Sequence, residues 1–229
     1  MSSRSISCAA GLLLGLVLTM TVPPAVAAPP LPPARQAALD AAVRDHEAGR
    51  VDAARSAFQQ LSRHQVPAAD YNLAVMHLRG EMPRSDRATA RRLLERAGAN
   101  GFVTAQFMLG RALETGELGA RDLVLAHRWY GAAAASGSVD AQVAMGTAHY
   151  LGRGMPKDLA RAAHWFREAA KAGDVGAQYL LASMYEAGDG VAKDLRLARY
   201  WYDIAARNGD EAAPGKLQEI DARLGALPG

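Results

Sequence analysis

The side chains of this sequence that most often take part in catalysis or metal binding are its six histidines and single cysteine. No His-x-x-x-His pair and no cysteine cluster has the spacing of metal ligands. His77 and His149 occupy equivalent places in an internal repeat, which favours a packing role for both. His127 and His164 are expected to be partly exposed polar residues. We therefore expect neither a metal site nor a cofactor.

Patterns for nucleophiles, catalytic carboxylates and phosphate loops are also weak. No Ser-x-x-Lys sequence occurs, so the nucleophile pattern of β-lactam-directed enzymes is missing. The Gly-x-Gly segments at 152–154 and 188–190 follow expected helices rather than strands, which is the wrong context for nucleotide binding. Aspartates recur at one spacing, as helix caps do, at Asp86, Asp122, Asp158 and Asp194. The sequence predicts no catalytic residues.

All of these residues belong to a repeat with a period of 36 residues. A fixed period of this length indicates a solenoid, in which each unit buries its apolar face on its neighbours. Besides the aspartates, two glycine series keep the period, at Gly80, Gly116, Gly152 and Gly188 and at Gly101, Gly137, Gly173 and Gly209. We place four units at 69–104, 105–140, 141–176 and 177–212.

Each unit is expected to contain two helices joined by a loop. In the third unit the first helix covers about 141–151, and glycine ends it because glycine adopts positive φ at low cost. Asp158 is placed to cap the second helix. Trp165 and Phe166 point about 100° apart on that helix. One ring is therefore expected to fill its own hairpin, and the other the joint to the next unit.

The first segment, 1–27, has the features of a secretory signal peptide: Arg4, an apolar run over 9–20 and the small residues Ala25-Val26-Ala27. An uncleaved anchor is the alternative, although the run is short for a bilayer span of about 20 residues. Cleavage would remove Cys8, leaving no disulfide and no thiol nucleophile. We expect a periplasmic or secreted protein of a Gram-negative bacterium, without stable membrane insertion after cleavage.

The segments on either side of the repeats are expected to be a spacer and two caps. Residues 28–33 form a Pro-rich linker. Residues 34–68 predict a tetratricopeptide-like capping hairpin, and 213–229 predict a C-terminal capping helix with a polar outer side. Terminal units of solenoids are atypical because their outer faces meet water.

Charge is mild and mixed along the chain, with 26 basic and 23 acidic residues and a formal charge of +3. This balance argues against nucleic acid or an anionic membrane as a partner. A protein or peptide partner of unknown identity is expected instead. Solenoid ends can stack on one another, so we expect a monomer or a weak dimer.

Residues 69–212 resemble the Sel-1-like repeat family, which is related to tetratricopeptide repeats. The shared pattern is AQ-x-x-[LM]-G-x-x-[HY]-x-x-G-x-G-x-x-x-D-x-x-x-A-x-x-W-[YF]-x-x-A-A-x-x-G, and it is best seen in 141–173 and 177–209. The resemblance implies an all-α fold, a right-handed α-solenoid of antiparallel helix hairpins whose first helices line a concave face. It also implies a role as an adaptor or scaffold for other proteins.

The third, seventh and tenth positions of each unit lie beside or opposite the core stripe of the first helix. Apolar groups at the third positions would form a ladder along the concave groove, with polar groups beside them, as suits a peptide-binding groove. The alternative is that this ladder packs between neighbouring first helices. The candidate partner-binding residues are Tyr71, Val75, Leu78, Phe107, Arg111, Glu114, Val143, Thr147, Tyr150, Tyr179, Ser183 and Glu186.

The sequence therefore favours an exported, non-enzymatic scaffold that binds a partner segment in the groove. One alternative is a secreted interaction factor directed at a host or competitor cell through the same surface. Another is a cell-wall or β-lactam-directed hydrolase, since cysteine-rich secreted relatives have been linked to β-lactams. This chain lacks the paired cysteines of those relatives.

Overall fold

The computed structural model describes residues 30–225, and this part of the chain contains eleven α-helices and no strand. The expected signal peptide, 1–27, lies outside the described residues. The predicted all-α class is confirmed. In chain order the helices are α1 (Pro33–Glu47), α2 (Val51–Arg63), α3 (Pro67–Leu78), α4 (Arg87–Ala99), α5 (Val103–Thr115), α6 (Leu123–Ala135), α7 (Val139–Leu151), α8 (Leu159–Lys171), α9 (Val175–Ala187), α10 (Leu195–Arg207) and α11 (Ala213–Gly225).

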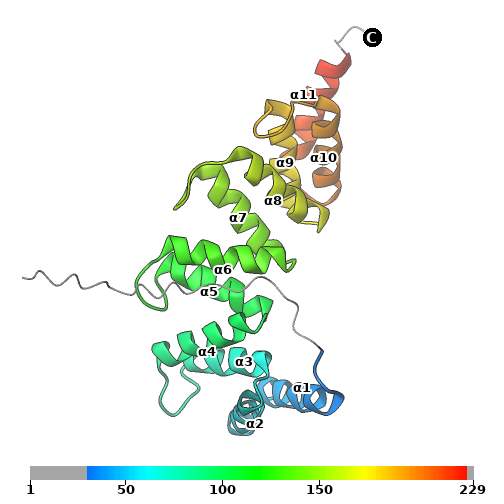
Figure 1. Cartoon of the computed structure of the whole chain (residues 1–229). Helices are drawn as coiled ribbons and strands as arrows, with labels where there is room; N and C mark the ends of the chain where they lie inside the picture. Colours follow the sequence, from blue (N-terminus) through cyan, green and yellow to red (C-terminus); the bar gives the residue numbers. More distant parts are fainter. Residues whose placement is uncertain (1–29, 226–229) are drawn as a thin grey trace, which may run out of the picture.

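The helices form hairpins that stack into one elongated, curved array (Figure 1). The four repeats supply the hairpins α3–α4, α5–α6, α7–α8 and α9–α10. The α1–α2 hairpin and α11 lie at opposite ends of the array. Every helix packs against the next one along the chain, and the buried side chains form a series of clusters. The apolar core is thus distributed along the stack, as in other solenoids.

Aspartates and glycines at the repeat period set the helix ends. The second helix of each repeat begins after an aspartate whose carboxylate accepts hydrogen bonds from backbone N–H groups of the first turn. The first helices α5, α7 and α9 end at glycines with φ of 81°, 68° and 87°, a region that residues with a Cβ rarely adopt. These local signals explain why the hairpins keep one length.

The paired aromatic residues of the second helices fill two different spaces. Phe166 packs inside its own hairpin, where a Cβ on Gly146 would lie 2.7 Å from the phenyl ring. Trp129 instead packs against the preceding hairpin, because its Cζ3 lies 3.0 Å from the place of a Cβ on Gly98, near the end of α4. The expectation for the hairpin ring is confirmed. The expectation that the other ring fills the joint to the next unit is wrong, since that ring faces the previous unit.

Buried glutamines tie each repeat to the one before it. Each side-chain amide reaches back to a backbone carbonyl near the end of the preceding second helix. The bonds run from Gln106 Nε2 to the Gly98 carbonyl at 2.9 Å, from Gln142 Nε2 to Ala134 at 3.2 Å and from Gln178 Nε2 to Ala170 at 3.2 Å. In the first repeat the equivalent residue is Asp70, whose buried carboxylate pairs with Arg96. The joints between hairpins are therefore polar as well as apolar.

Replacing Gln142 by glutamate tests this tie. The change removes the donor and places a carboxylate against the Ala134 carbonyl in a buried joint, so we expect a loss of about 2 kcal/mol in unfolding free energy at pH 7. The deficit relative to the parent protein should shrink at pH 4, where the carboxyl regains a proton and can donate. Urea unfolding at both pH values measures it, and an equal deficit at pH 4 would contradict the account.

Candidate functional site

The structure places all twelve candidate residues on the first helices α3, α5, α7 and α9 of the repeats. We call their shared surface the first-helix face. Arg111 is exposed, and the other eleven candidates are half-buried. None is wholly withdrawn into the core, so each can present part of its surface to a partner.

The apolar ladder on the first-helix face is shared between packing and the surface. The Tyr71 ring lies 5.2 Å from the Phe102 ring, between centroids. Phe107 and Tyr179 pack in the same way on second-helix rings, at 5.6 Å from Tyr130 and 5.1 Å from Tyr202. Val143 packs against the cluster built around Phe166 and Leu181. One side of each ladder residue therefore contributes to packing, and the rest stays accessible.

The acidic candidates Glu114 and Glu186 are engaged in hydrogen bonds and ion pairs. Glu114 accepts a hydrogen bond from the Tyr130 hydroxyl at 2.8 Å and pairs with Arg153 at 3.1 Å. Burial and the bond to Glu114 raise the pKa of Tyr130, so its hydroxyl stays a donor. Glu186 likewise accepts from Tyr202, at 3.1 Å, and receives a bond from an arginine of α11. These carboxylates join their hairpins to the next element of the chain, so they are not free to pair with a partner protein.

The sequence carries a signal for this arrangement that lies outside the pattern of the first helices. Glutamate stands at the tenth position of a unit only where the second aromatic residue of that unit is tyrosine. The four pairs are Leu78 with Leu94, Glu114 with Tyr130, Tyr150 with Phe166 and Glu186 with Tyr202. The hydroxyl and its carboxylate acceptor thus occur together. The residue pattern of the first helix alone does not reveal this pairing, because the hydroxyl lies on the second helix.

The described chain also contains a cavity that sequence reasoning did not find. It has a volume of about 480 Å³ and lies between α6, α7 and the loop before α8. We call it the joint cavity. Its lining residues are Val124, His127, Arg128, Met145, His149, Gly154, Met155, Pro156, Lys157, Asp158 and Arg161.

Two buried histidines line the joint cavity. His127 is 8% exposed and His149 is 6% exposed, so the expectation that His127 is partly exposed is wrong. The cause is the neighbouring loop: a Cβ on Gly154 would lie 3.0 Å from His127 Cε1 and 2.7 Å from Leu123 Cβ. This close approach of the loop to α6 covers the imidazole.

Burial also governs the protonation of both imidazoles. Desolvation lowers the pKa of His127, with a smaller opposing effect from the Glu114 carboxylate. Desolvation likewise lowers the pKa of His149, and Arg161 lowers it further while Asp158 raises it. The Nδ1 atom of each ring has no hydrogen-bond partner among residues 30–225. Both histidines are therefore neutral at pH 7.

These lowered pKa values predict a loss of stability on acidification. A histidine with a depressed pKa in the folded state binds fewer protons than in the unfolded state, so its stabilising contribution is full above pH 6.5 and falls as the pH drops through the folded pKa values. Urea unfolding between pH 8 and 5 should show this slope in the parent protein. The slope of stability against pH should be smaller in the double variant His127→Ala/His149→Tyr. Its new residues are those found 36 residues further on, at Ala163 and Tyr185, in the joint between the third and fourth repeats. An unchanged slope would contradict the assignment.

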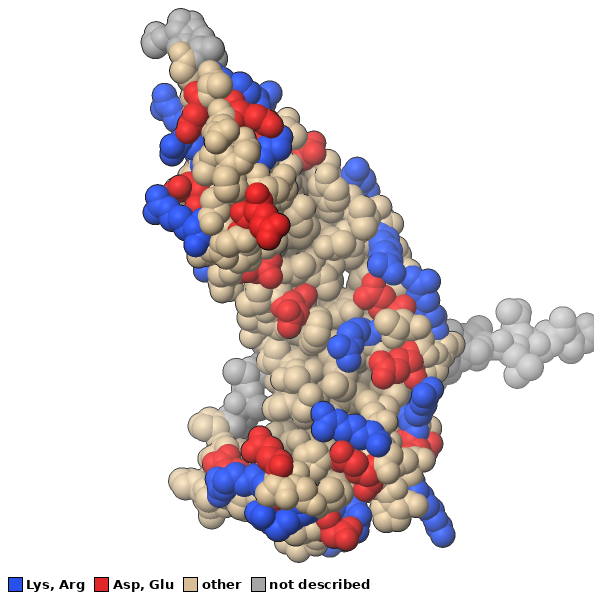
Figure 2. Space-filling view, turned by 180° about the vertical axis from the view of Figure 1, so that it is seen from behind, with Lys and Arg blue, Asp and Glu red and all other residues tan. Residues whose placement is uncertain are grey.

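Among the described residues there is neither a cluster of metal ligands nor a membrane-spanning helix. Residues 30–225 contain no group of three or more His, Cys, Asp or Glu side chains placed to hold a metal ion. No helix in the same range is both long and apolar enough to cross a membrane. Acidic and basic side chains are interspersed over the face shown in Figure 2, with uncharged surface between them.

This architecture defines a helical-repeat protein built from 36-residue hairpins. The pattern of the Sel1 repeat family matches four consecutive segments, 67–102, 103–138, 139–174 and 175–210. The chain belongs to the Sel1 repeat family, whose members generally mediate protein–protein interactions. The matched segments begin two residues before the units delimited from the sequence, where the first helices start.

Similar solved structures include a protective antigen of uropathogenic Escherichia coli that displays an SLR fold. It is 27% identical, with a TM-score of 0.75, over 84% of this chain and 42% of that one. A Sel1 repeat protein from Oxalobacter formigenes is 31% identical, with a TM-score of 0.67, over 73% of this chain and 49% of that one. This chain thus matches less than half the length of either structure. No functionally curated protein matches it.

Proposed function

We propose that this protein is an exported, non-enzymatic scaffold that binds a segment of a partner protein on its first-helix face. The observation that carries the proposal is the contrast between constant and variable positions of the repeat. Aspartates and glycines recur in all four units and a buried aromatic ring recurs in the last three, whereas the seventh position changes from Val75 to Arg111, Thr147 and Ser183. Variation on a fixed framework is what selective recognition of one partner requires.

The physical character of the face supports protein binding over small-molecule chemistry. Its half-buried aromatic rings offer apolar area that is already held by packing, so little side-chain entropy is lost when a partner docks. Binding energy at protein interfaces is concentrated in such anchored aromatic residues. The family's general role in protein–protein interaction agrees with this use.

Substitutions at the seventh positions test the proposal while the ladder residues themselves stay unchanged. We expect Arg111→Glu/Thr147→Arg/Ser183→Arg to reduce capture of a partner by immobilised protein spanning 28–229 by at least about tenfold, as loss of a central contact does. The matched control changes exposed second-helix residues at one repeat phase, as Arg92→Glu/His164→Arg/Tyr200→Ser. If both variants are folded by circular dichroism and lose partner capture equally, the proposal is contradicted.

Export is part of the proposal and needs its own test. Cell fractionation should place the protein in the periplasm, and mass spectrometry of the intact chain should find a start near Ala28, as the signal-peptide pattern predicts. Recovery chiefly in culture medium would instead favour an interaction factor directed at other cells. A cytosolic chain that still begins at residue 1 would contradict export.

A further inference from the structure

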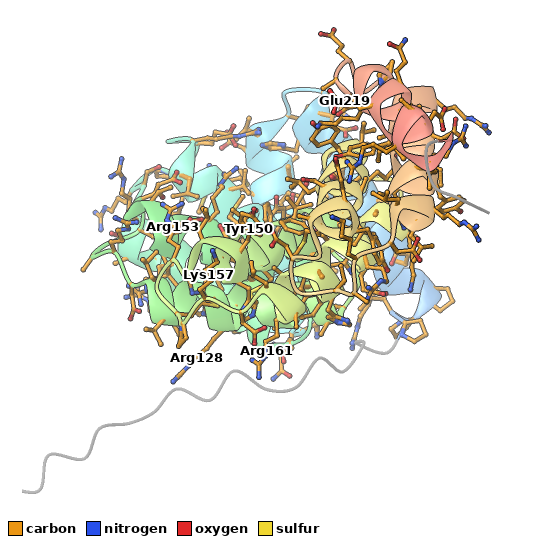
Figure 3. All side chains as sticks on the ribbon, turned by 90° about the horizontal axis from the view of Figure 1, so that it is seen from above. Arg128, Tyr150, Arg153, Lys157, Arg161 and Glu219 are labelled. Atoms are coloured by element: carbon orange, nitrogen blue, oxygen red, sulfur yellow. The ribbon has the colours of Figure 1, made fainter. Side chains whose placement is uncertain are left out.

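The joint cavity is separate from the first-helix face, because none of the twelve candidate residues lines it. It lies where the loop before α8 meets α6. Figure 3 shows Arg128 and Arg161 at the same edge of the molecule, with Lys157 farther in toward Tyr150. The cavity's volume of about 480 Å³ falls within the range of small-molecule sites, roughly 300–1,000 Å³.

The floor of the cavity holds two imidazoles with unused hydrogen-bonding capacity. His127 and His149 are both more than nine-tenths buried, and the Nδ1 of each has no partner within the described residues. A buried polar atom without a partner is costly, and native structures rarely keep two in the lining of one cavity without a use. Both Nδ1 atoms are closed to water, so the ring nitrogen that can meet an acceptor in the cavity is Nε2, which donates when it carries the proton.

This polar floor occurs at one joint only among those between the four repeats. At the next joint the equivalent residues are Ala163 and Tyr185, and the Tyr185 hydroxyl accepts a bond from Arg167 at 3.0 Å. At the previous joint the equivalents are Arg91 and Leu113, so no histidine pair forms. The repeat architecture therefore does not require the histidines, which the other joints replace with groups of different chemistry.

The rim of the cavity is cationic and its walls are apolar. Asp158 is the only acidic residue that lines the cavity. Its carboxylate already accepts a hydrogen bond from the Arg161 backbone N–H at 2.9 Å and forms an ion pair with the Arg161 guanidinium at 3.3 Å. The Lys157 ammonium lies 5.6 Å from the centre of the Tyr150 ring and has no carboxylate partner within residues 30–225. The apolar walls come from Val124, Met145, Met155 and Pro156.

We propose that the joint cavity binds an organic carboxylate with an apolar body. The carboxylate would accept hydrogen bonds from the two imidazoles and pair with Lys157, while the apolar body lies against the methionine, valine and proline walls. An inorganic anion would leave those walls unused, and a neutral apolar molecule would leave the imidazoles and the ammonium without partners. Opposite charge together with apolar contact thus selects this class of ligand.

Titrations followed by NMR of the histidine imidazoles test the proposal. The probes are N-acetyl-leucine, its neutral amide, inorganic phosphate and an acetylated Gly-Gly-Leu peptide with a free carboxylate. For a ligand as small as N-acetyl-leucine we expect a Kd of about 1 mM, with shifts at His127 and His149 and none at the exposed His164. The amide and phosphate should bind at least about tenfold more weakly, because each lacks one of the two recognised groups.

Two variants keep the test decisive. Lys157→Gln should weaken the binding of N-acetyl-leucine several-fold and leave the stability of the protein unchanged. His127→Ala/His149→Tyr should abolish this binding while the protein stays folded, because the new residues are those at the equivalent positions of the next joint. If both the peptide and N-acetyl-leucine bind, the site recognises the C-terminal carboxylate of a polypeptide chain. If only N-acetyl-leucine binds, the site recognises small molecules. Either result supports the proposal. Equal binding of acid and amide, equal binding of phosphate, or no shifts at His127 and His149 would overturn it.

Discussion

Replacing Phe166 by alanine is expected to destabilise the folded protein by about 3–5 kcal/mol, the usual cost of emptying a buried phenylalanine site. Phe166 is 2% exposed, packs on Gly146 of α7 and belongs to a buried cluster that includes Leu181 and Met184 of α9. Because hairpins stabilise one another through their joints, the loss should also weaken the fourth repeat. Urea unfolding followed by circular dichroism measures the change.

A matched substitution distinguishes lost packing from general damage. Phe166→Tyr keeps the ring but leaves a hydroxyl without an acceptor, and adding Tyr150→Glu recreates the pair that Tyr130 and Glu114 form in the second repeat. We expect the double variant to be more stable than Phe166→Tyr alone by about 1 kcal/mol, the usual worth of one hydrogen bond. If Phe166→Ala cost less than about 1 kcal/mol, the hairpin would not depend on this ring, contrary to its burial.

The second large effect is expected at the joint between the N-terminal hairpin and the first repeat. The Asp70 carboxylate is 0% exposed and accepts bonds from Arg96 Nε at 2.6 Å and Arg96 Nη2 at 2.5 Å, while Nη2 also reaches the Ser62 hydroxyl at 2.7 Å. Arg96→Ala leaves a buried carboxylate without its partner. We expect a loss of about 3 kcal/mol, the low end for a broken buried pair, because the arginine itself is half-exposed.

The other repeats supply a rescue for this variant. Glutamine stands at the Asp70 position in the three later units and ties each to the previous helix by an amide bond. Adding Asp70→Gln to Arg96→Ala removes the stranded charge and offers an amide to the end of α2. We expect the double variant to regain more than half of the lost free energy of unfolding. A double variant less stable than Arg96→Ala would show that the buried charge is not the cause.

Much of the architecture follows from local signals that the sequence carries openly. An aspartate can cap a helix and a glycine can adopt positive φ wherever the chain places them, so Asp158 and Gly152 define a hairpin without knowledge of its neighbours. Repetition of those signals every 36 residues then implies a stack. The fold class and the repeat family were accordingly predictable from the residues alone.

Features that depend on how one hairpin meets another were not predictable in the same way. Helical periodicity separates Trp165 from Phe166 by an angle but does not say whether the tryptophan faces the previous or the next unit. The burial of His127 likewise depends on Gly154, which lies in the following repeat and lets the loop approach α6. The joint cavity arises from the same tertiary contact, which no pattern within one unit records.

The most direct test of the proposed function locates the partner on the surface. A photo-crosslinking amino acid at Thr147, on the first-helix face, should capture a partner in cells, whereas the same amino acid at His164, on the second helix of the same repeat, should not. Thr147 is half-buried and His164 is exposed, so both positions can accept a larger side chain. Crosslinks to one protein from position 147 alone are the predicted result. Crosslinks from position 164 alone would contradict recognition on the first-helix face.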